Sequence, residues 1–334
     1  HWFDVARAVS AAADDPSVDG IIVTHGTFTA EETAYFLHLC VRTEKSIVVV
    51  ASQRKHDEVG NDGDRNIIDS VDYVVSRIWA DEQGRNALGA VVIQDEQIFT
   101  AREVQKGDAR PGGYVATGGH GGIVGTMGQP GPPALTFRTI KRHTYTSAVN
   151  LSGLPEAVEG VGMNGGALRK VAVPIKDGQG NLLGTAIPKV TIVKHARYLP
   201  EDASGDPASE VDILARIEKN LRDAPLAGFV AEGSAPFGSM STAVDAALKR
   251  AAFSGMPVVR VGRGNAEGPM DPHRSPFSIA GSNLTATKAR LLLMACLMKL
   301  GSLPVAADPK NPTKVEIDFL NKTLAAYQAM FDTH

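Results

Sequence analysis

The segment Thr24-His25-Gly26-Thr27 holds the first side chain that could do chemistry, the hydroxyl of Thr27. It follows an apolar, β-branched run (residues 20–23) that predicts a buried parallel strand, and it precedes Thr29-Ala30-Glu31-Glu32, which has the form of a helix capping box. Thr27 is therefore expected at a strand-to-helix turn. In open α/β sheets such turns lie beyond the carboxyl ends of the strands, where backbone N–H groups and the helix dipole converge on an anion. A reacting carbonyl could be held there.

The composition is that of an ordinary globular protein. The chain has 334 residues, of which 43% are hydrophobic and 21% charged, and this length predicts two domains. The net charge of −3 and the scattered Lys and Arg residues give no basic face, so we expect no nucleic-acid partner. No apolar run approaches the roughly 20 residues of a membrane span, and no signal peptide is visible, although a leader could have preceded His1.

The cysteine and histidine patterns argue against a disulfide framework and against a metal centre. Cys40 and Cys296 lie far apart on expected helices, and we interpret both as buried, small hydrophobic side chains. The nine histidines form no His-Glu-x-x-His motif, and the chain has no Cys-x-x-Cys pair. We therefore expect no metal ion.

Helices and strands alternate along the first part of the chain in the manner of a doubly wound fold. Apolar periodicity predicts helices over residues 2–13, 30–41 and 65–76, and strands over residues 20–23, 46–50 and 88–93. This spacing implies right-handed crossovers and a parallel sheet. The predicted fold class is α/β, with a three-layer parallel-sheet N-terminal domain and a smaller α/β C-terminal domain.

The domain boundaries follow from the loops and from a second alternation. We expect an N-terminal α/β domain over residues 1–155, a connector with a hairpin over residues 156–186, and a C-terminal α/β domain over residues 187–334. Gly and Pro dominate residues 112–133, which we interpret as plain turns because no phosphate-binding motif is completed there. Asp177-Gly178-Gln179-Gly180-Asn181 separates two alternating apolar runs and predicts the turn of the hairpin.

Four blocks together resemble the bacterial-type L-asparaginase/glutaminase family. The second signature of that family is similar to Thr24-His25-Gly26-Thr27 with Glu31-Glu32-Thr33-Ala34-Tyr35-Phe36-Leu37. Three further blocks fall in the order of the family: Asn61-Asp62-Gly63 with Asn66, Ala101-Arg102-Glu103-Val104-Gln105-Lys106, and Leu284-Thr285-Ala286-Thr287-Lys288-Ala289-Arg290. The match runs from His1 to about Phe331, so the resemblance implies the asparaginase fold.

The resemblance implies a hydrolase of side-chain amides that works through threonines and needs no cofactor. The nucleophilic threonine of the family would precede His1, so the N-terminal domain is expected to lack its first strand. Thr27 matches the second threonine of the family, and Lys106 matches the lysine paired with it. A lysine can take the proton of a threonine hydroxyl only where burial lowers the lysine pKa from about 10.4 toward about 7–8. Backbone donors at the Gly26-Thr27 turn could meet the oxyanion.

Two positions depart from the pattern of the family. Phe28 stands where the family has an aspartate that holds the α-amino group of the substrate. A reshaped pocket is one reading, and a hydrophobic staple that packs Phe28 against Thr33 is the other. The segment from Gly233 to Ser239 replaces an asparagine-containing loop of the family that reaches the site of a neighbouring subunit. The resemblance matches Glu267 to the glutamate that the family contributes across the dimer. Phe28, Ser239, Glu267 and Gly26 are therefore the expected substrate-binding residues.

Three functions remain open at this point. The first is an asparaginase-like amidohydrolase that releases ammonia from a small amide such as L-asparagine. The second is an amidohydrolase for an amide without a free α-amino group, and the third is a non-catalytic binding or regulatory protein on the same fold. The resemblance implies a homotetramer, a dimer of dimers, in the cytoplasm or the periplasm, with the cytoplasm as the first expectation.

Overall fold

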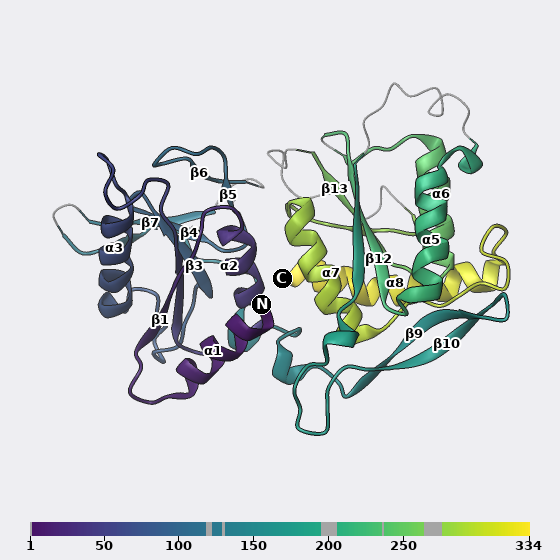
Figure 1. The fold of residues 1–334 in the computed structure, drawn as a ribbon, viewed down its shortest axis with the longest axis horizontal. Helices are drawn as coiled ribbons and strands as arrows, with labels where there is room; N and C mark the ends of the chain where they lie inside the picture. Colours follow the sequence, from purple (N-terminus) through teal and green to yellow (C-terminus); the bar gives the residue numbers. More distant parts are fainter. Residues whose placement is uncertain (1, 118–121, 129–130, 195–205, 236, 264–275) are drawn as a thin grey trace. The chain divides into compact units, whose positions relative to one another are not determined.

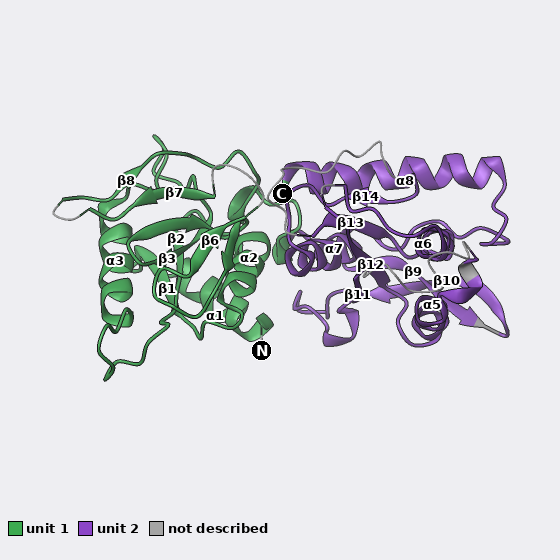
Figure 2. Ribbon diagram, turned by 90° about the horizontal axis from the view of Figure 1, so that it is seen from above, with its two compact units in different colours: residues 1–152, 334 green, residues 153–333 purple. Residues whose placement is uncertain are grey.

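The structure is a computed structural model that describes residues 2–117, 122–128, 131–194, 206–235, 237–263 and 276–334. The chain divides into two compact units, which are coloured green and purple in Figure 2. Unit 1 contains residues 1–152 and His334, and unit 2 contains residues 153–333. We describe each unit by itself.

Unit 1 is built on three parallel strands, as the alternation of the sequence predicts. These are β1 (Gly20–Thr24), β2 (Ser46–Val50) and β3 (Ala90–Gln94), and β2 lies between the other two. Helices α1 (Trp2–Asp14) and α2 (Ala30–Cys40) cover one face of the sheet, and α3 (Gly63–Ser76) covers the other (Figure 1). Every residue of β2 and β3 is buried, because parallel strands between two helical layers have no face in water.

An antiparallel extension enlarges this sheet to six strands. It contains β4 (Gln97–Thr100), β7 (Ile123–Thr126) and β8 (Ala134–Leu135), which follow β3 in that order. Asp95 and Glu96 both have positive φ values and form the tight turn between β3 and β4. A separate hairpin pairs β5 (Val104–Lys106) with β6 (Tyr114–Ala116). Residues 112–133 are therefore not plain turns, since they contain β6 and β7.

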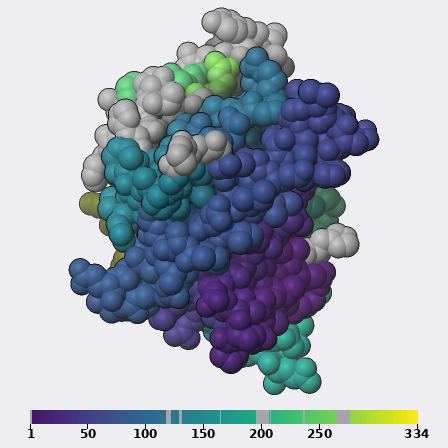
Figure 3. All heavy atoms as spheres, turned by 90° about the vertical axis from the view of Figure 1, so that its left-hand side faces the viewer, coloured from purple at the N-terminus to yellow at the C-terminus, as the bar shows by residue number. Residues whose placement is uncertain are grey.

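Residues from the first third of the chain form most of the face of unit 1 that Figure 3 shows in purple and blue. Two 3₁₀ helices, η1 (Thr144–Thr146) and η2 (Leu151–Gly153), follow β8 in the sequence. The core beneath includes Trp79, Tyr73, Val91 and Ile98, all of which are buried. These side chains pack between α3 and the sheet, so they fix α3 on one face of the sheet that carries the Thr27 turn.

Unit 2 is a second α/β layer structure with a four-stranded parallel sheet. The sheet contains β11 (Lys189–Lys194), β12 (Ala227–Gly233), β13 (Val258–Gly262) and β14 (Ile279–Ala280) in sequence order. The helices are α5 (Val211–Asp223), α6 (Thr242–Phe253), α7 (Ala286–Leu300) and α8 (Lys314–Thr333), with the 3₁₀ turns η3 (Gly184–Ala186) and η4 (Pro207–Ser209). In Figure 1, α7 lies on one side of β12, and α5 and α6 lie on the other.

The hairpin of the connector turns at a different place from the predicted one. Strands β9 (Ala157–Asn164) and β10 (Ala167–Pro174) pair along their whole length around Gly165 and Gly166, which both have positive φ values. Residues 177–181 form only a small turn, closed by a bridge between Lys176 and Leu182. Two adjacent glycines adopt the left-handed region without a Cβ penalty, and this explains why the longer hairpin closes there.

Both cysteines have the character that the sequence predicts. Cys40 on α2 and Cys296 on α7 are free and buried, and burial raises the pKa of the Cys40 thiol to about 12. In the part of the chain that the structure describes, none of the helices has the length and apolarity to cross a bilayer.

Candidate active site

Thr27 and Lys106 meet in unit 1, although they lie far apart in the sequence. Thr27 lies in the turn between the end of β1 at Thr24 and the start of α2 at Ala30, and Lys106 is the last residue of β5. The Nζ atom of Lys106 donates a hydrogen bond of 2.7 Å to Oγ1 of Thr27. A hydroxyl and an amine at this distance can exchange a proton directly.

The β5–β6 hairpin holds Lys106 against the start of α2 through two further hydrogen bonds. The backbone N–H of Lys106 donates to Oε2 of Glu31 over 3.2 Å. Directly across the hairpin, Tyr114 pairs with Lys106, and its hydroxyl donates to the backbone oxygen of Thr27 over 3.1 Å. The hairpin therefore contacts both the backbone of Thr27 and the first turn of α2. These contacts fix where the amine of Lys106 lies relative to the Thr27 hydroxyl.

Tyr114 stays protonated in this environment. Its side chain is buried, and burial together with the negative charges of Glu31 and Asp62 raises the pKa of the Tyr114 hydroxyl. The hydroxyl consequently acts as a stable hydrogen-bond donor to Thr27. Tyr114 and Glu31 are the two site residues that the sequence did not reveal as such, because their roles depend on the pairing of β5 with β6.

The capping box expected at the start of α2 does not form. Thr29 occupies the N-cap position with φ −140° and ψ 21°, and its side chain makes no capping hydrogen bond. Glu31, one residue before the capping-box position Glu32, accepts from the backbone N–H of Lys106. The first turn of the helix is thus connected to the β5–β6 hairpin through Glu31, and not to its own N-cap side chain.

Phe28 is exposed, so the hydrophobic staple is wrong. Its exposed fraction is 92%, while its expected partner Thr33 is fully buried and hydrogen-bonded to Nε2 of His25 over 3.1 Å. The Nζ atom of Lys106 lies 5.3 Å from the centroid of the Phe28 ring. This is a cation–π geometry, which places an apolar ring beside the amine of the candidate site.

Gly26 lies at the open side of the same turn. A Cβ atom at this position would meet no heavy atom within 4 Å. The carbonyl oxygen of Gly26 is 2.7 Å from Nδ1 of His25. The backbone around Thr27 therefore borders open space on the Gly26 side, as a turn that receives a ligand requires.

Two acidic residues of the neighbouring loops are held in the ionised form. Asp108 contacts Arg110 at 2.6 Å, and hydrogen bonds from Arg110 lower the pKa of Asp108 to about 2. Burial opposes the ionisation of Asp62, but backbone N–H groups of Gln53 and Arg54 donate to its carboxylate and lower its pKa overall. Asp62 therefore orders the loop after β2 through its hydrogen bonds.

A buried ion pair anchors the segment that leads to Lys106. Nη1 of Arg102 lies 2.7 Å from Oε1 of Glu103, and both side chains are buried. Nε of Arg102 donates to the backbone oxygen of His334 over 2.7 Å, and the Thr100 hydroxyl donates to Glu103. This part of the Ala101–Lys106 block has a structural role, since it fixes the turn between β4 and β5.

The other two expected site residues are Ser239 and Glu267. Ser239 belongs to unit 2, where it forms a bridge with Ser234 and lines a cavity. Glu267 lies outside the described residues. Within those residues, no group of three or more His, Cys, Asp or Glu side chains is placed to hold a metal ion.

Comparisons with known proteins find similarity to asparaginases. Residues 1–121 match the family model described as Asparaginase, N-terminal. The glutaminase-asparaginase of Acinetobacter glutaminasificans is 35% identical over 159 residues, which is 47% of this chain and 45% of the relative. The L-asparaginase 2 of Escherichia coli (strain K12) is 26% identical over 312 residues, which is 89% of this chain and 70% of the relative.

The match to most relatives is confined to part of their length. The L-asparaginase of Bacillus licheniformis is 40% identical, but over 32% of this chain and 31% of the relative. The similarity of the fold extends over more of the chain than the similarity of the sequence. The structure entitled probable cytoplasmic L-asparaginase from Campylobacter jejuni superposes with a TM-score of 0.68 at 24% identity, covering 100% of this chain and 83% of that one. Residues 1–121 are therefore similar to the N-terminal domain of asparaginases, and the fold along the whole chain resembles that of a solved L-asparaginase.

Proposed function

We propose that this protein is an asparaginase-like amidohydrolase that releases ammonia from a small amide, such as L-asparagine, by threonine-based nucleophilic catalysis. The observation that carries the proposal is the hydrogen bond of 2.7 Å between Nζ of Lys106 and Oγ1 of Thr27. The family model and the relatives named glutaminase-asparaginase support an amide as the substrate. No cofactor is required for this reaction.

The proposed reaction begins with proton transfer inside the dyad. We assign to Thr27 the nucleophilic role that the resemblance places before His1. The neutral amine of Lys106 takes the hydroxyl proton of Thr27 while Oγ1 bonds to the carbonyl carbon of the amide. The electron pair of the C=O bond moves to oxygen, and backbone N–H groups at the Gly26-Thr27 turn are the proposed donors to this oxyanion. The C–N bond then breaks, and the ammonium of Lys106 gives its proton to the leaving nitrogen. Water hydrolyses the resulting ester, with Lys106 again as the base.

Rapid quenching of the reaction followed by peptide mass spectrometry tests this role of Thr27. We expect an acyl adduct on the peptide that contains Thr27, and ammonia in equal amount during the first turnover. An adduct on another residue would contradict the assignment of Thr27 as the nucleophile, while leaving amide hydrolysis intact. If no member of a panel of amides releases ammonia although an amide still binds, the protein is a binding or regulatory member of the family.

The second candidate function is hydrolysis of an amide without a free α-amino group, and Phe28 is the observation that favours it. An ammonium ion beside an apolar ring keeps a cation–π attraction of about 0.5–2 kcal/mol, but it lacks the charge-assisted hydrogen bond of about 1.5–3 kcal/mol that a carboxylate would give. The amine of Lys106 already lies over this ring. A second cation at the same place would also be repelled by Lys106 whenever that residue is charged.

Assembly is part of the proposal. Resemblance to the family implies a homotetramer of tight dimers, in which Ser239 and Glu267 serve the site of a neighbouring subunit. Activity should then fall on dilution below the range in which the dimer dissociates. Sedimentation velocity and activity measured on the same dilution series check this, and a fully active monomer would exclude shared sites.

A further inference from the structure

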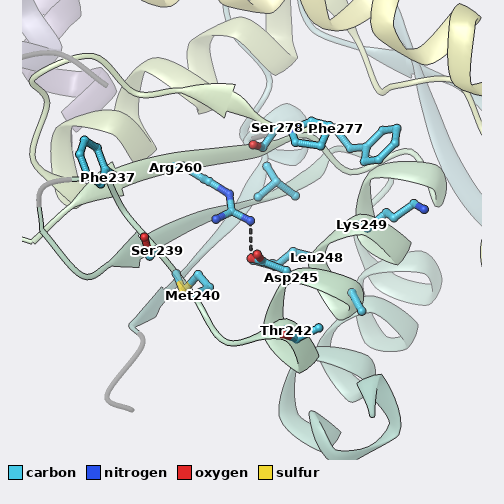
Figure 4. A pocket seen from close by; sticks show the side chains of 13 residues that line it. Phe237, Ser239, Met240, Thr242, Asp245, Leu248, Lys249, Arg260, Phe277 and Ser278 are labelled. Atoms are coloured by element: carbon cyan, nitrogen blue, oxygen red, sulfur yellow. Dashed lines mark hydrogen bonds and ion pairs between the residues drawn. The ribbon is translucent and has the colours of Figure 1, made fainter. Parts of the chain in front are cut away.

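Unit 2 contains a cavity of about 620 Å³, of whose lining the proposed reaction uses only Ser239. Its wall comes from the loop after β12, from the first half of α6, from β13 and from the segment before β14. Figure 4 shows the guanidinium of Arg260 among the side chains that line it, with Phe237 and Ser239 on one side and Phe277 and Ser278 on another. The cavity has the size of an ordinary small-molecule site.

Arg260 is the buried charge of this cavity. It lies in the middle of β13, and the exposed fraction of its side chain is 9%. One terminal nitrogen donates to Asp245, and the other lies 3.4 Å from the carbonyl oxygen of Gly238. Among the described residues, Nε of Arg260 has no hydrogen-bond partner. A buried N–H without an acceptor is unfavourable, so Arg260 is an incompletely paired cation in the wall of the cavity.

The charged side chains that line the cavity determine whether it favours an anion or a cation. Lys249 also lines the cavity, with its Nζ atom 4.9 Å from the centroid of the Phe277 ring. The carboxylate of Asp245 neutralises one of the two cations, so one positive charge remains among the described lining residues. Phe277, Leu248 and Val258 provide an apolar wall. An anion of single charge with an apolar body matches both features.

We propose that this cavity binds a small monocarboxylate with an apolar body. The carboxylate accepts hydrogen bonds from the guanidinium of Arg260, whose planar array of N–H groups matches a carboxylate, and Lys249 adds charge at the edge. The apolar body packs against Phe277 and Leu248. A phosphate fits less well, since its second negative charge would face Asp245 without a further cation in the described lining.

Calorimetric titration of the intact protein with 3-phenylpropanoate tests the proposal. The matched ligand is 3-phenylpropan-1-ol, which keeps the ring and lacks the charge, and which cannot be hydrolysed as an amide could. We expect one saturable site per chain, and affinity for the acid at least about tenfold above that for the alcohol. Equal affinity for both ligands, tighter binding of inorganic phosphate, or no saturable binding of the acid would overturn the proposal.

Variants of the residues that line the cavity test whether 3-phenylpropanoate binds there. Asp245→Asn removes the anion that competes for Arg260, so the acid should bind about three- to tenfold more tightly. Arg260→Lys should weaken binding by about tenfold or more because it loses the fork of donors. Lys249→Met should weaken it about two- to fivefold, while Lys322→Met, which removes an exposed lysine of α8, should leave it unchanged.

The variant Lys106→Met shows whether the acid binds in the cavity or at the Thr27–Lys106 dyad. Lys106→Met should retain full affinity for 3-phenylpropanoate, since Lys106 belongs to unit 1 and not to the cavity. If Lys106→Met abolishes binding while Asp245→Asn and Lys249→Met leave it unchanged, the acid occupies the dyad site and the cavity proposal is wrong. Asp245→Asn and Lys249→Met change partly or fully exposed side chains, so they report on the cavity even if Arg260→Lys does not fold.

Discussion

The hydroxyl of Tyr114 donates a hydrogen bond to the backbone oxygen of Thr27 over 3.1 Å. In the same hairpin, Tyr114 pairs directly with Lys106, whose Nζ atom reaches Oγ1 of Thr27. One side of the hairpin therefore holds the backbone of the Thr27 turn, and the other presents an amine to its side chain. The distance between amine and hydroxyl is set by the register of two short strands.

Removal of either member of the dyad should abolish most activity without unfolding the protein. Lys106→Met keeps most of the apolar stem and removes the amine, and Thr27→Val keeps the shape of the side chain and removes the hydroxyl. We expect kcat to fall by about 10²–10⁴-fold in each variant. Ammonia release measures the effect, and far-UV circular dichroism reports whether the fold is kept. Near wild-type turnover in both variants would show that the dyad is assigned wrongly.

Tyr114 is a positioning residue in the proposed reaction, so Tyr114→Phe should act mainly on kcat. The ring still fills its buried site, but the hydrogen bond to Thr27 is lost at a cost of about 0.5–1.5 kcal/mol. We expect kcat to fall about three- to tenfold with little change in KM. Tyr145→Phe, on η1, is a matched control that should leave kcat unchanged. A rise in KM at constant kcat would instead place Tyr114 in contact with the substrate.

Unit 1 should lose stability in mild acid because it buries histidines. Burial lowers the pKa of His143 to about 4 and lowers the pKa of the neighbouring His38 as well, against about 6.5 in an unfolded chain. Between these pH values the unfolded chain binds more protons than the folded one. The free energy of unfolding therefore decreases as the pH falls from about 6.5 to about 4, by roughly 2–3 kcal/mol for His143, and levels off below that.

Urea unfolding at a series of pH values measures this effect. His143→Gln should flatten part of the slope between pH 4 and pH 6.5, and the remainder should come from His38. His56→Gln is the control, because the side chain of His56 is 85% exposed. A slope that is unchanged in His143→Gln would show that other groups cause the acid sensitivity.

Apolar periodicity was sufficient to predict the parallel parts of the fold. Strands β1 to β3 and their helices contain long apolar runs at regular spacing, and each lies within a few residues of its predicted range. The antiparallel strands β6 and β7 were missed because each has four residues or fewer and lies in a segment rich in glycine. Their pairing depends on partners elsewhere in the chain, which a local pattern does not contain.

Some residues of the candidate site could be predicted from the sequence, and others could not. Thr27 and Lys106 could be named from the sequence because they lie in blocks that resemble a family. Tyr114 lies outside those blocks, and Glu31 lies in one of them without an assigned role, because the contacts of both depend on the pairing of β5 with β6. The capping box shows the opposite case, in which the local pattern was present but the side chain of Thr29 makes no capping hydrogen bond. Tertiary contacts decide such positions.

Phe28 offers a test of substrate choice that separates this chain from an asparaginase with an aspartate at the same place. Its side chain is 92% exposed, so a substitution changes the site and leaves the core intact. An α-ammonium group placed against the ring lacks an ionic partner, which should cost about 1.5–3 kcal/mol, or roughly 10–10²-fold in discrimination. The effect belongs in the ratio of kcat/KM values for two substrates, because it concerns one group of one substrate.

The measurement compares ammonia release from L-asparagine and from succinamate, its analogue without the α-amino group. We expect the wild type to hydrolyse succinamate with a kcat/KM similar to or above that for asparagine. Phe28→Asp should shift the ratio toward asparagine by about 10–10²-fold, whereas Phe28→Leu, which removes the ring without adding charge, should not. If the wild type already favours asparagine by more than about a thousandfold, another group holds the ammonium, since the loss of one charge-assisted hydrogen bond is too small to be hidden by such a preference.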